Sequence, residues 1–215
     1  MKRIGSVQTK DQIADVIREF IISGRLIPEQ EIVQEELADQ LQLSRTPVRE
    51  ALQQLEKEGY LERLANRHMR IRATSPDEIT RAFKIIAGIE YELLDIIMVK
   101  DIDILSLEKI LRKLLDTCDT NQLNKARAYE LEIHRTISEI TSYGYLATLH
   151  QKLLAGYPRY AIMNSDSIPE GRVNGLRVAM DLLKRKSKAE LKAAVEEYYL
   201  NLAACFFGSI SPSGL

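Results

Sequence analysis

Apolar residues recur every three or four positions along most of the chain, the spacing that places them on one face of an α-helix. The first such stripe predicts a helix over about residues 9–23, followed by Gly24 as a stop. After residue 75 no strand-like alternation appears, and the stripes predict helices over about 76–99, 106–117, 121–141, 145–164, 172–185 and 188–207. The pattern therefore predicts a mostly α-helical chain whose C-terminal part is an all-α bundle of about six helices.

Residues 37–60, LADQLQLSRTPVREALQQLEKEGY, predict two short helices that meet at a sharp angle. The break falls around Gln42, and Ser44 is a suitable N-cap for the second helix. Pro47 falls in the first turn, where a missing amide donor costs nothing, and Gly59 ends the helix. This is the layout of a helix-turn-helix, whose second helix presents its N-terminal side chains to base edges in the major groove.

Two short runs of alternating exposure follow at 60–64 and 69–73, separated by a turn. They predict a β-hairpin, or wing, that carries several arginines, with Asn66 holding the turn conformation. A basic ribbon beside the second helix can reach phosphates or the minor groove. The candidate DNA-contacting residues of the whole segment are Ser44, Arg45, Thr46, Pro47, Arg49, Arg63, Asn66, Arg67 and His68.

The string SRTPVREAL, within LQLSRTPVREALQQLEKEGYL, resembles the winged-helix domain of GntR-type bacterial transcription regulators. The helical region after it resembles the effector-binding and dimerisation domain of the family's FadR branch, often called the FCD domain. The resemblance implies a DNA-binding winged helix over residues 1–74 and a helical effector domain over residues 75–215. It also implies a ligand-responsive homodimer whose two winged helices read the half-sites of a palindromic operator on double-stranded DNA.

The resemblance further implies a pocket among the helices. Many FCD-type domains place there an acidic residue and a His from one helix, completed by two His from later helices. Glu130 and His134 match the first pair, because a spacing of four places both on one helix face. The later positions fall at Leu176 and Tyr198, which supply no imidazole, and His150 lies on a different helix and is a poor substitute.

A second departure lies at Ile86, where the family usually has an arginine one turn before an acidic residue. We therefore expect no bound metal or cofactor, and a small organic effector that differs in kind from the usual small organic acids. The hydroxyl of Tyr198 is expected near His134 or a ligand. The candidate effector contacts are Ile86, Glu130, His134, Leu176, Tyr198 and Asn201. Arg159, Arg172 and Arg177 could orient a ligand, but exposed positions on a solvated face also explain them.

The charge of the predicted DNA-binding segment is more informative about DNA binding than the net charge of the whole chain. The 215 residues carry a net charge of −1, yet seven cations and four carboxylates between Ser44 and Arg72 leave +3. A patch this modest predicts affinity carried by two half-sites. The two cysteines are too few and too far apart for a disulfide framework, and no membrane span or signal peptide is apparent, so we expect a cytoplasmic protein without a membrane partner.

Other functions remain as alternatives to a DNA-binding regulator. One is a metal-dependent carboxylate sensor of the same fold. Another is an enzyme with Glu130 and His134 as acid and base, although the chain has no nucleophile elbow and no phosphate-binding glycine loop. A third is a winged helix used for protein assembly without DNA. For His134 itself, a hydrogen-bonded core position, an effector contact and a metal ligand all remain open.

Overall fold

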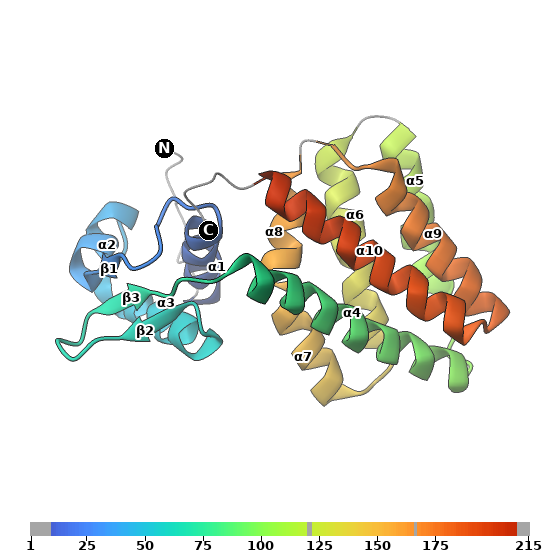
Figure 1. Cartoon of the computed structure of the whole chain (residues 1–215), viewed down its shortest axis with the longest axis horizontal. Helices are drawn as coiled ribbons and strands as arrows, with labels where there is room; N and C mark the ends of the chain where they lie inside the picture. Colours follow the sequence, from blue (N-terminus) through green and yellow to red (C-terminus); the bar gives the residue numbers. More distant parts are fainter. Residues whose placement is uncertain (1–9, 120–121, 166, 210–215) are drawn as a thin grey trace. The chain divides into compact units, whose positions relative to one another are not determined.

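A computed structural model describes residues 10–119, 122–165 and 167–209, which form ten helices and a three-stranded antiparallel sheet (Figure 1). Thr9 and Asn121, where two of the predicted helices begin, lie outside the described residues, as do both ends of the chain. The described part divides into two compact units at Pro76 and Asp77. The predicted fold class, a winged helix-turn-helix followed by an all-α domain, is confirmed.

The N-terminal unit packs three helices against a small sheet. Its helices are α1 (Lys10–Ile22), α2 (Gln34–Leu41) and α3 (Arg45–Glu58), and its strands are β1 (Glu31–Ile32), β2 (Leu61–Arg63) and β3 (Met69–Ile71). Apolar side chains from every helix and from the sheet meet in one core, including Ile17, Leu52 and Ile71. Burial of this shared core sets the position of α3 relative to the wing.

The turn between α2 and α3 lies where the sequence predicts it. Gln42 adopts a left-handed conformation with φ 57° and ψ 40°, and the N–H of Leu43 donates to the carbonyl of Ala38 at 2.9 Å. Gly59, with φ 89°, ends α3 in the same conformation, which costs glycine little. Ser44 is the N-cap residue of α3, as predicted, and has extended backbone, but its side chain makes no capping hydrogen bond.

The wing is a hairpin of β2 and β3, but it is part of a larger sheet than predicted. β1 pairs with β3 on the other side, with Ile32 opposite Met69, in the order β1-β3-β2. Asn66 is predicted to adopt the turn conformation, but the residue with a positive φ in this turn is Arg67, at 69°. The side-chain oxygen of Asn66 instead accepts a hydrogen bond from the N–H of His68 at 3.0 Å.

The second unit is a bundle of seven described helices. They are α4 (Pro76–Val99), α5 (Leu105–Asp119), α6 (Leu123–Ile140), α7 (Gly144–Leu154), α8 (Tyr157–Asn164), α9 (Glu170–Arg185) and α10 (Lys188–Ser209). α5 packs on α6, and α9 and α10 lie side by side (Figure 1). None of the helices described is both long and apolar enough to cross a membrane.

The single helix predicted over 145–164 is wrong, because the chain breaks between α7 and α8. Gly156 leaves the helical region at φ −86° and ψ −128°. Pro158 follows in the first turn of α8, where its missing N–H is tolerated. In a continuous helix, the Pro158 ring would clash with the carbonyl of Leu154, so a new helix starts instead.

Candidate functional site

The exposed edge of α3 carries the residues predicted to read DNA. Val48 and Leu52 are buried in the N-terminal core, which leaves Arg45, Thr46 and Arg49 exposed at the start of the helix. The sequence predicts which side chains of α3 are exposed, because the apolar stripe determines which face of the helix turns inward. Its two arginines are the residue type that makes bidentate contacts to guanine or phosphate.

A cleft of about 430 Å³ lies between α3, the start of α2 and the wing. It brings together four predicted DNA-contacting residues, Arg49, Arg63, Arg67 and His68. The other five do not line it: Ser44, Arg45, Thr46 and Pro47 lie at the N-terminal edge of α3, and Asn66 lies in the wing turn. The predicted residues therefore form one surface of the N-terminal unit with a hollow beside α3.

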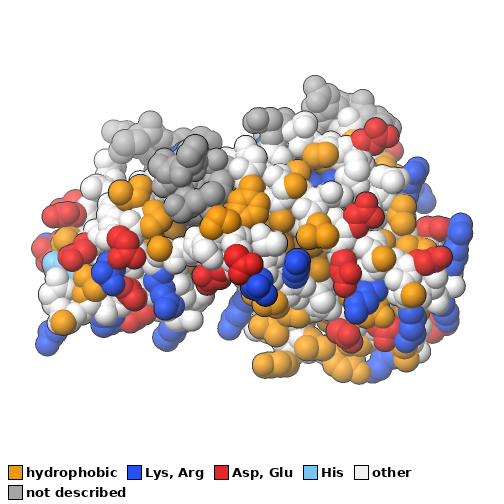
Figure 2. All heavy atoms as spheres, in the orientation of Figure 1, with side chains coloured by type: hydrophobic (Ala, Val, Ile, Leu, Met, Phe, Trp, Pro, Cys, Tyr) orange, Lys and Arg blue, Asp and Glu red, His pale blue; other side chains and the backbone are white. Residues whose placement is uncertain are grey.

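Carboxylates pair with several of the cations on this surface. Arg45 Nη1 lies 2.5 Å from Glu35, and two nitrogens of Arg63 lie 3.0 and 2.7 Å from Glu56. The hydrogen bonds from Arg63 hold the pKa of the Glu56 carboxyl below its usual range. Figure 2 shows acidic and basic side chains interleaved on the visible face of this unit.

Further pairs cover the wing. Arg70 contacts Glu62 and, at 3.2 Å, Glu29, while His68 Nδ1 lies 3.4 Å from Glu31. Glu29, Glu31 and Glu35 lie outside the segment with the +3 excess, and their three charges cancel it. Within the part of the chain that the structure describes, Arg49 and Arg67 make no ion pair. They are the cations of the cleft that remain available to a phosphate or a base.

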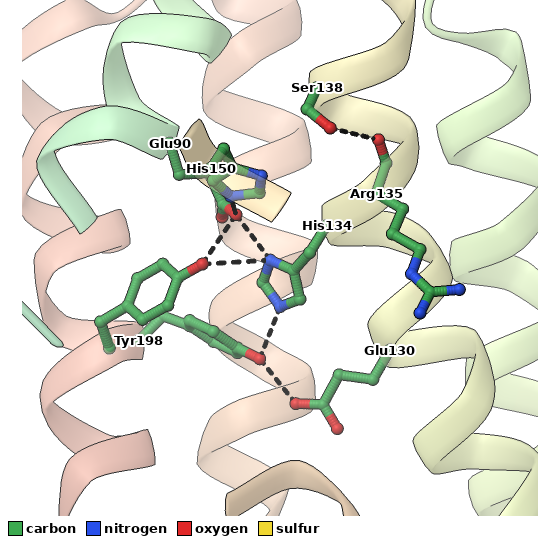
Figure 3. Close-up of polar contacts among 8 residues, drawn as sticks. Glu90, Glu130, His134, Arg135, Ser138, His150 and Tyr198 are labelled. Carbon is green, nitrogen blue, oxygen red and sulfur yellow. Dashed lines mark hydrogen bonds and ion pairs between the residues drawn. The ribbon is translucent and has the colours of Figure 1, made fainter. Parts of the chain in front are cut away.

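The helical unit contains a buried polar cluster, which Figure 3 shows in close-up. One oxygen of Glu90 on α4 accepts hydrogen bonds from His134 at 2.7 Å, His150 at 2.9 Å and Tyr199 at 2.8 Å. These four residues come from α4, α6, α7 and α10. Burial by itself raises the pKa of Glu90, but the two imidazoles outweigh it and hold that pKa far below the usual range.

Tyr198 joins this half of the cluster to a second carboxylate. Its hydroxyl donates to Glu130 at 2.7 Å and lies 2.8 Å from His134 Nε2 (Figure 3). Because that proton points to Glu130, Nε2 of His134 has to donate, and Nδ1 also donates to Glu90. His134 is thus an imidazolium. Burial lowers its pKa, but the charge and hydrogen bond of Glu90 exceed this effect and raise it.

The second carboxylate has a cation of its own. Arg172 on α9 donates from Nε and Nη2 to the two oxygens of Glu130, at 2.8 and 2.6 Å. Burial lowers the pKa of Arg172, but Glu130 more than compensates and raises it. The charges of Glu90 and Glu130 are therefore balanced by those of His134 and Arg172, which makes a neutral, buried network.

Three of the predicted effector residues, Glu130, His134 and Tyr198, belong to this cluster. Ile86, Glu130, His134, Leu176 and Tyr198 are all buried, and the expected approach of the Tyr198 hydroxyl to His134 is confirmed at 2.8 Å. Asn201 is exposed on α10 and is not one of these buried side chains, and its contact with an effector stays a prediction. Arg172 is 1% exposed, which corrects the view that it lies on a solvated face.

A divalent metal does not fit these side chains. Both nitrogens of His134 already donate hydrogen bonds, and both oxygens of Glu130 accept from a guanidinium. A metal ligand has to present a free lone pair, which His134 lacks while both its nitrogens donate, and a cation at Glu130 would lie beside the charge of Arg172. Within the described ranges, no group of three or more His, Cys, Asp or Glu could hold a metal ion.

The sequence did not predict three members of the cluster as site residues, Glu90, His150 and Tyr199, and it indicated Arg172 only as a residue that could orient a ligand. His150 lies on a different helix from His134, as predicted, yet its side chain reaches the same carboxylate as His134. Its Nδ1 is buried without a hydrogen-bond partner among the described residues. The signal was the position of polar residues on apolar stripes, as with Arg172, which shares one helix face with Leu176 and Leu183.

The exposed edge of α3, its wing and the cleft between them define a winged helix-turn-helix DNA-binding domain. Residues 9–71 match the model of the gntR family of bacterial regulatory proteins, so this domain is of the GntR type. A stretch of 51 residues is 51% identical to the arabinose metabolism transcriptional repressor of Geobacillus stearothermophilus. That match covers 23% of this chain and only 14% of the repressor's length.

Solved structures share the fold along nearly the whole chain. E. coli McbR/YncC is 18% identical, has a TM-score of 0.68, and matches 94% of this chain and 99% of its own. A putative transcriptional regulator GntR from Rhodococcus sp. RHA1 is 16% identical, with a TM-score of 0.64 and coverage of 94% and 99%. At these identities the likeness shows a common fold of winged helix and helical domain.

Proposed function

We propose that this chain is a sequence-specific, DNA-binding transcription regulator of the FadR branch, which binds a palindromic operator as a homodimer. The observation that carries the proposal is the exposed start of α3, with Arg45, Thr46 and Arg49 beside the cleft of a GntR-type domain. An arginine at this place can make a bidentate contact with O6 and N7 of guanine. Arg67, at the wing turn, is suited to a phosphate or the minor groove.

Charge compensation on the DNA-binding surface supports a dimer. The ion pairs of Arg45, Arg63 and Arg70 weaken the field that attracts DNA, so one domain binds weakly. Two linked domains on two half-sites convert the second contact into an intramolecular step and restore affinity. The twofold axis of the dimer then sets the spacing of the half-sites.

An apolar surface on α7 is a candidate dimer interface. Tyr145 is 82% exposed and Leu149, one turn later, is 36% exposed. Figure 2 shows hydrophobic side chains gathered over α7 in the helical unit. Residues four apart share a helix face, and a second copy of this chain would remove both side chains from water.

The helical unit is proposed to bind a small organic effector next to the buried cluster. Glu130 is already neutralised by Arg172, which favours an uncharged effector over a carboxylate held by a metal. Such a ligand would exchange hydrogen bonds with Tyr198 or His134 rather than add a charge. The effector can change the free energy of DNA binding only by as much as its own binding free energy differs between two arrangements of the dimer.

The proposal is tested by selecting DNA with the full-length chain from a pool of random duplexes. A palindromic sequence should be enriched, and its two halves should be related by the twofold symmetry of a dimer. The Arg49→Ala chain serves as the control and should enrich a sequence with relaxed preference at one base pair in each half. If the folded wild-type chain enriches no sequence over the starting pool, sequence-specific binding is contradicted.

A further inference from the structure

Two side chains of α2 contact Arg45, the first residue of α3. Glu35 Oε1 lies 2.5 Å from Arg45 Nη1. The neighbouring Gln34 donates its amide to the carbonyl oxygen of Arg45 at 3.4 Å. The start of α2 therefore engages both the side chain and the main chain of Arg45 at the edge where we expect DNA.

The Glu35–Arg45 ion pair contributes little to folding. Its side chains are 61% and 64% exposed, and water screens an ion pair at such a position. Its location is more informative, because Glu35 also lines the cleft together with Arg49 and Arg67. A carboxylate there places negative charge on a surface that would face a polyanion.

We propose that Glu35 increases specificity by pairing with Arg45, an inference that rests on the proposed DNA binding. A guanidinium has five N–H donors in a planar fork, so a carboxylate at Nη1 leaves other donors for the edge of a guanine. The same carboxylate neutralises the charge that would attract a phosphate. Phosphates are alike in every sequence, so Glu35 weakens binding to wrong sequences more than binding to the operator.

The matched control lies next to Glu35 on the same helix. Glu36 is also an exposed carboxylate on α2, but it makes no ion pair with any residue that the structure describes. Replacing either residue with glutamine removes the same charge from α2. Any difference between the two variants therefore reports the contact with Arg45 rather than the net charge of the domain.

The experiment measures affinity of the full-length chain for its selected operator and for a scrambled duplex of equal length and composition. Glu35→Gln should raise affinity for the scrambled duplex roughly fivefold, the effect of one recovered phosphate contact, and change operator affinity by less than about twofold. The slope of log affinity against log salt on the scrambled duplex should steepen by about one. Glu36→Gln should leave the ratio of the two affinities unchanged.

A second arm repeats both substitutions in an Arg45→Ala chain. There Glu35→Gln should have no more effect than Glu36→Gln, because the residue through which Glu35 acts is gone. If the effect persists without Arg45, or if Glu35→Gln keeps the wild-type ratio, this inference is overturned while DNA binding stands. A wild-type chain that binds operator and scrambled duplex equally would overturn the proposed function, and this inference with it.

Discussion

Arg172 and Glu130 form a two-point ion pair in the interior of the helical unit, with N–O distances of 2.8 and 2.6 Å. Arg172 is 1% exposed and so is Glu130, so neither charge can be solvated if its partner is lost. Breaking a buried pair is costly for this reason, whereas replacing both members by neutral groups is often tolerated. The charge of the Glu130 carboxylate is therefore balanced by a side chain of the protein, Arg172.

Removal of one partner should therefore destabilise the chain strongly. Arg172→Met should lower the free energy of unfolding by about 3–5 kcal/mol, because Glu130 is left as an uncompensated buried charge. Urea unfolding followed by circular dichroism measures the change. Arg177→Met, on the exposed side of the same helix, is the control and should cost less than about 1 kcal/mol.

The double variant Glu130→Gln with Arg172→Met sharpens this test. It removes both charges, so much of the stability lost in Arg172→Met should return. A double variant that is less stable than Arg172→Met would contradict the view that the lone carboxylate causes the loss.

Stability should depend on pH through Glu90 and His134. The pKa of His134 is raised above 6.5, so its stabilising contribution is complete below pH 6.5 and is lost as pH rises through the folded-state value. The pKa of Glu90 is lowered from 4.5, so its contribution is complete above that pH and is lost on acidification. Urea unfolding should therefore show the greatest stability between pH 4.5 and pH 6.5.

The control for this pH dependence is His134→Gln, which should flatten the decline in stability above pH 6.5. A wild-type chain of constant stability from pH 6.5 to about 9 would contradict this account.

The apolar surface of α7 should control oligomeric state. Replacing Tyr145 and Leu149 by glutamate places charges where a partner would exclude water, and should raise the dimer dissociation constant roughly 100-fold. Analytical ultracentrifugation measures it. Lys152→Glu, an exposed change on the same helix, controls for added negative charge. A dimer that survives the double change would place the interface elsewhere.

The wing should contribute affinity without sequence choice. Arg67→Ala should weaken binding to every duplex by a similar factor and make the salt slope shallower by about one, because a phosphate contact releases counterions and reads no base. Titrations of several duplexes over a salt series measure both effects. Loss of preference at one particular base pair would show that Arg67 reads sequence.

Local features of the N-terminal unit were predictable because each follows from a few neighbouring residues. Gly59 ends α3, and the turn lies at Gln42, since chain reversal there depends on short-range backbone preferences. β1 was missed because a strand of two residues has no measurable alternation, and its pairing with β3 depends on the folded sheet. The break before α8 had a local signal in Gly156 and Pro158, but the apolar stripe on either side concealed it.

The buried cluster was predictable only in part. The spacing of Glu130 and His134 places both on one face of α6, as found. Helical periodicity gives the inward face of each helix but not which helices meet, so the contacts of Glu90 with His150, 60 residues away, could not be foreseen. For Arg172, the stripe it shares with Leu176 did indicate burial, and charge argued wrongly against it.

The most direct test of sequence-specific DNA binding is a titration of the full-length chain against its own upstream region over a salt series, with Arg49→Ala as comparison. The account predicts site-specific retention with a steep salt slope, and a loss of about 1–3 kcal/mol with relaxed preference at one base pair per half-site in the variant. Equal affinity for the upstream region and unrelated DNA would contradict it. So would a folded Arg49→Ala chain with unchanged affinity and sequence preference.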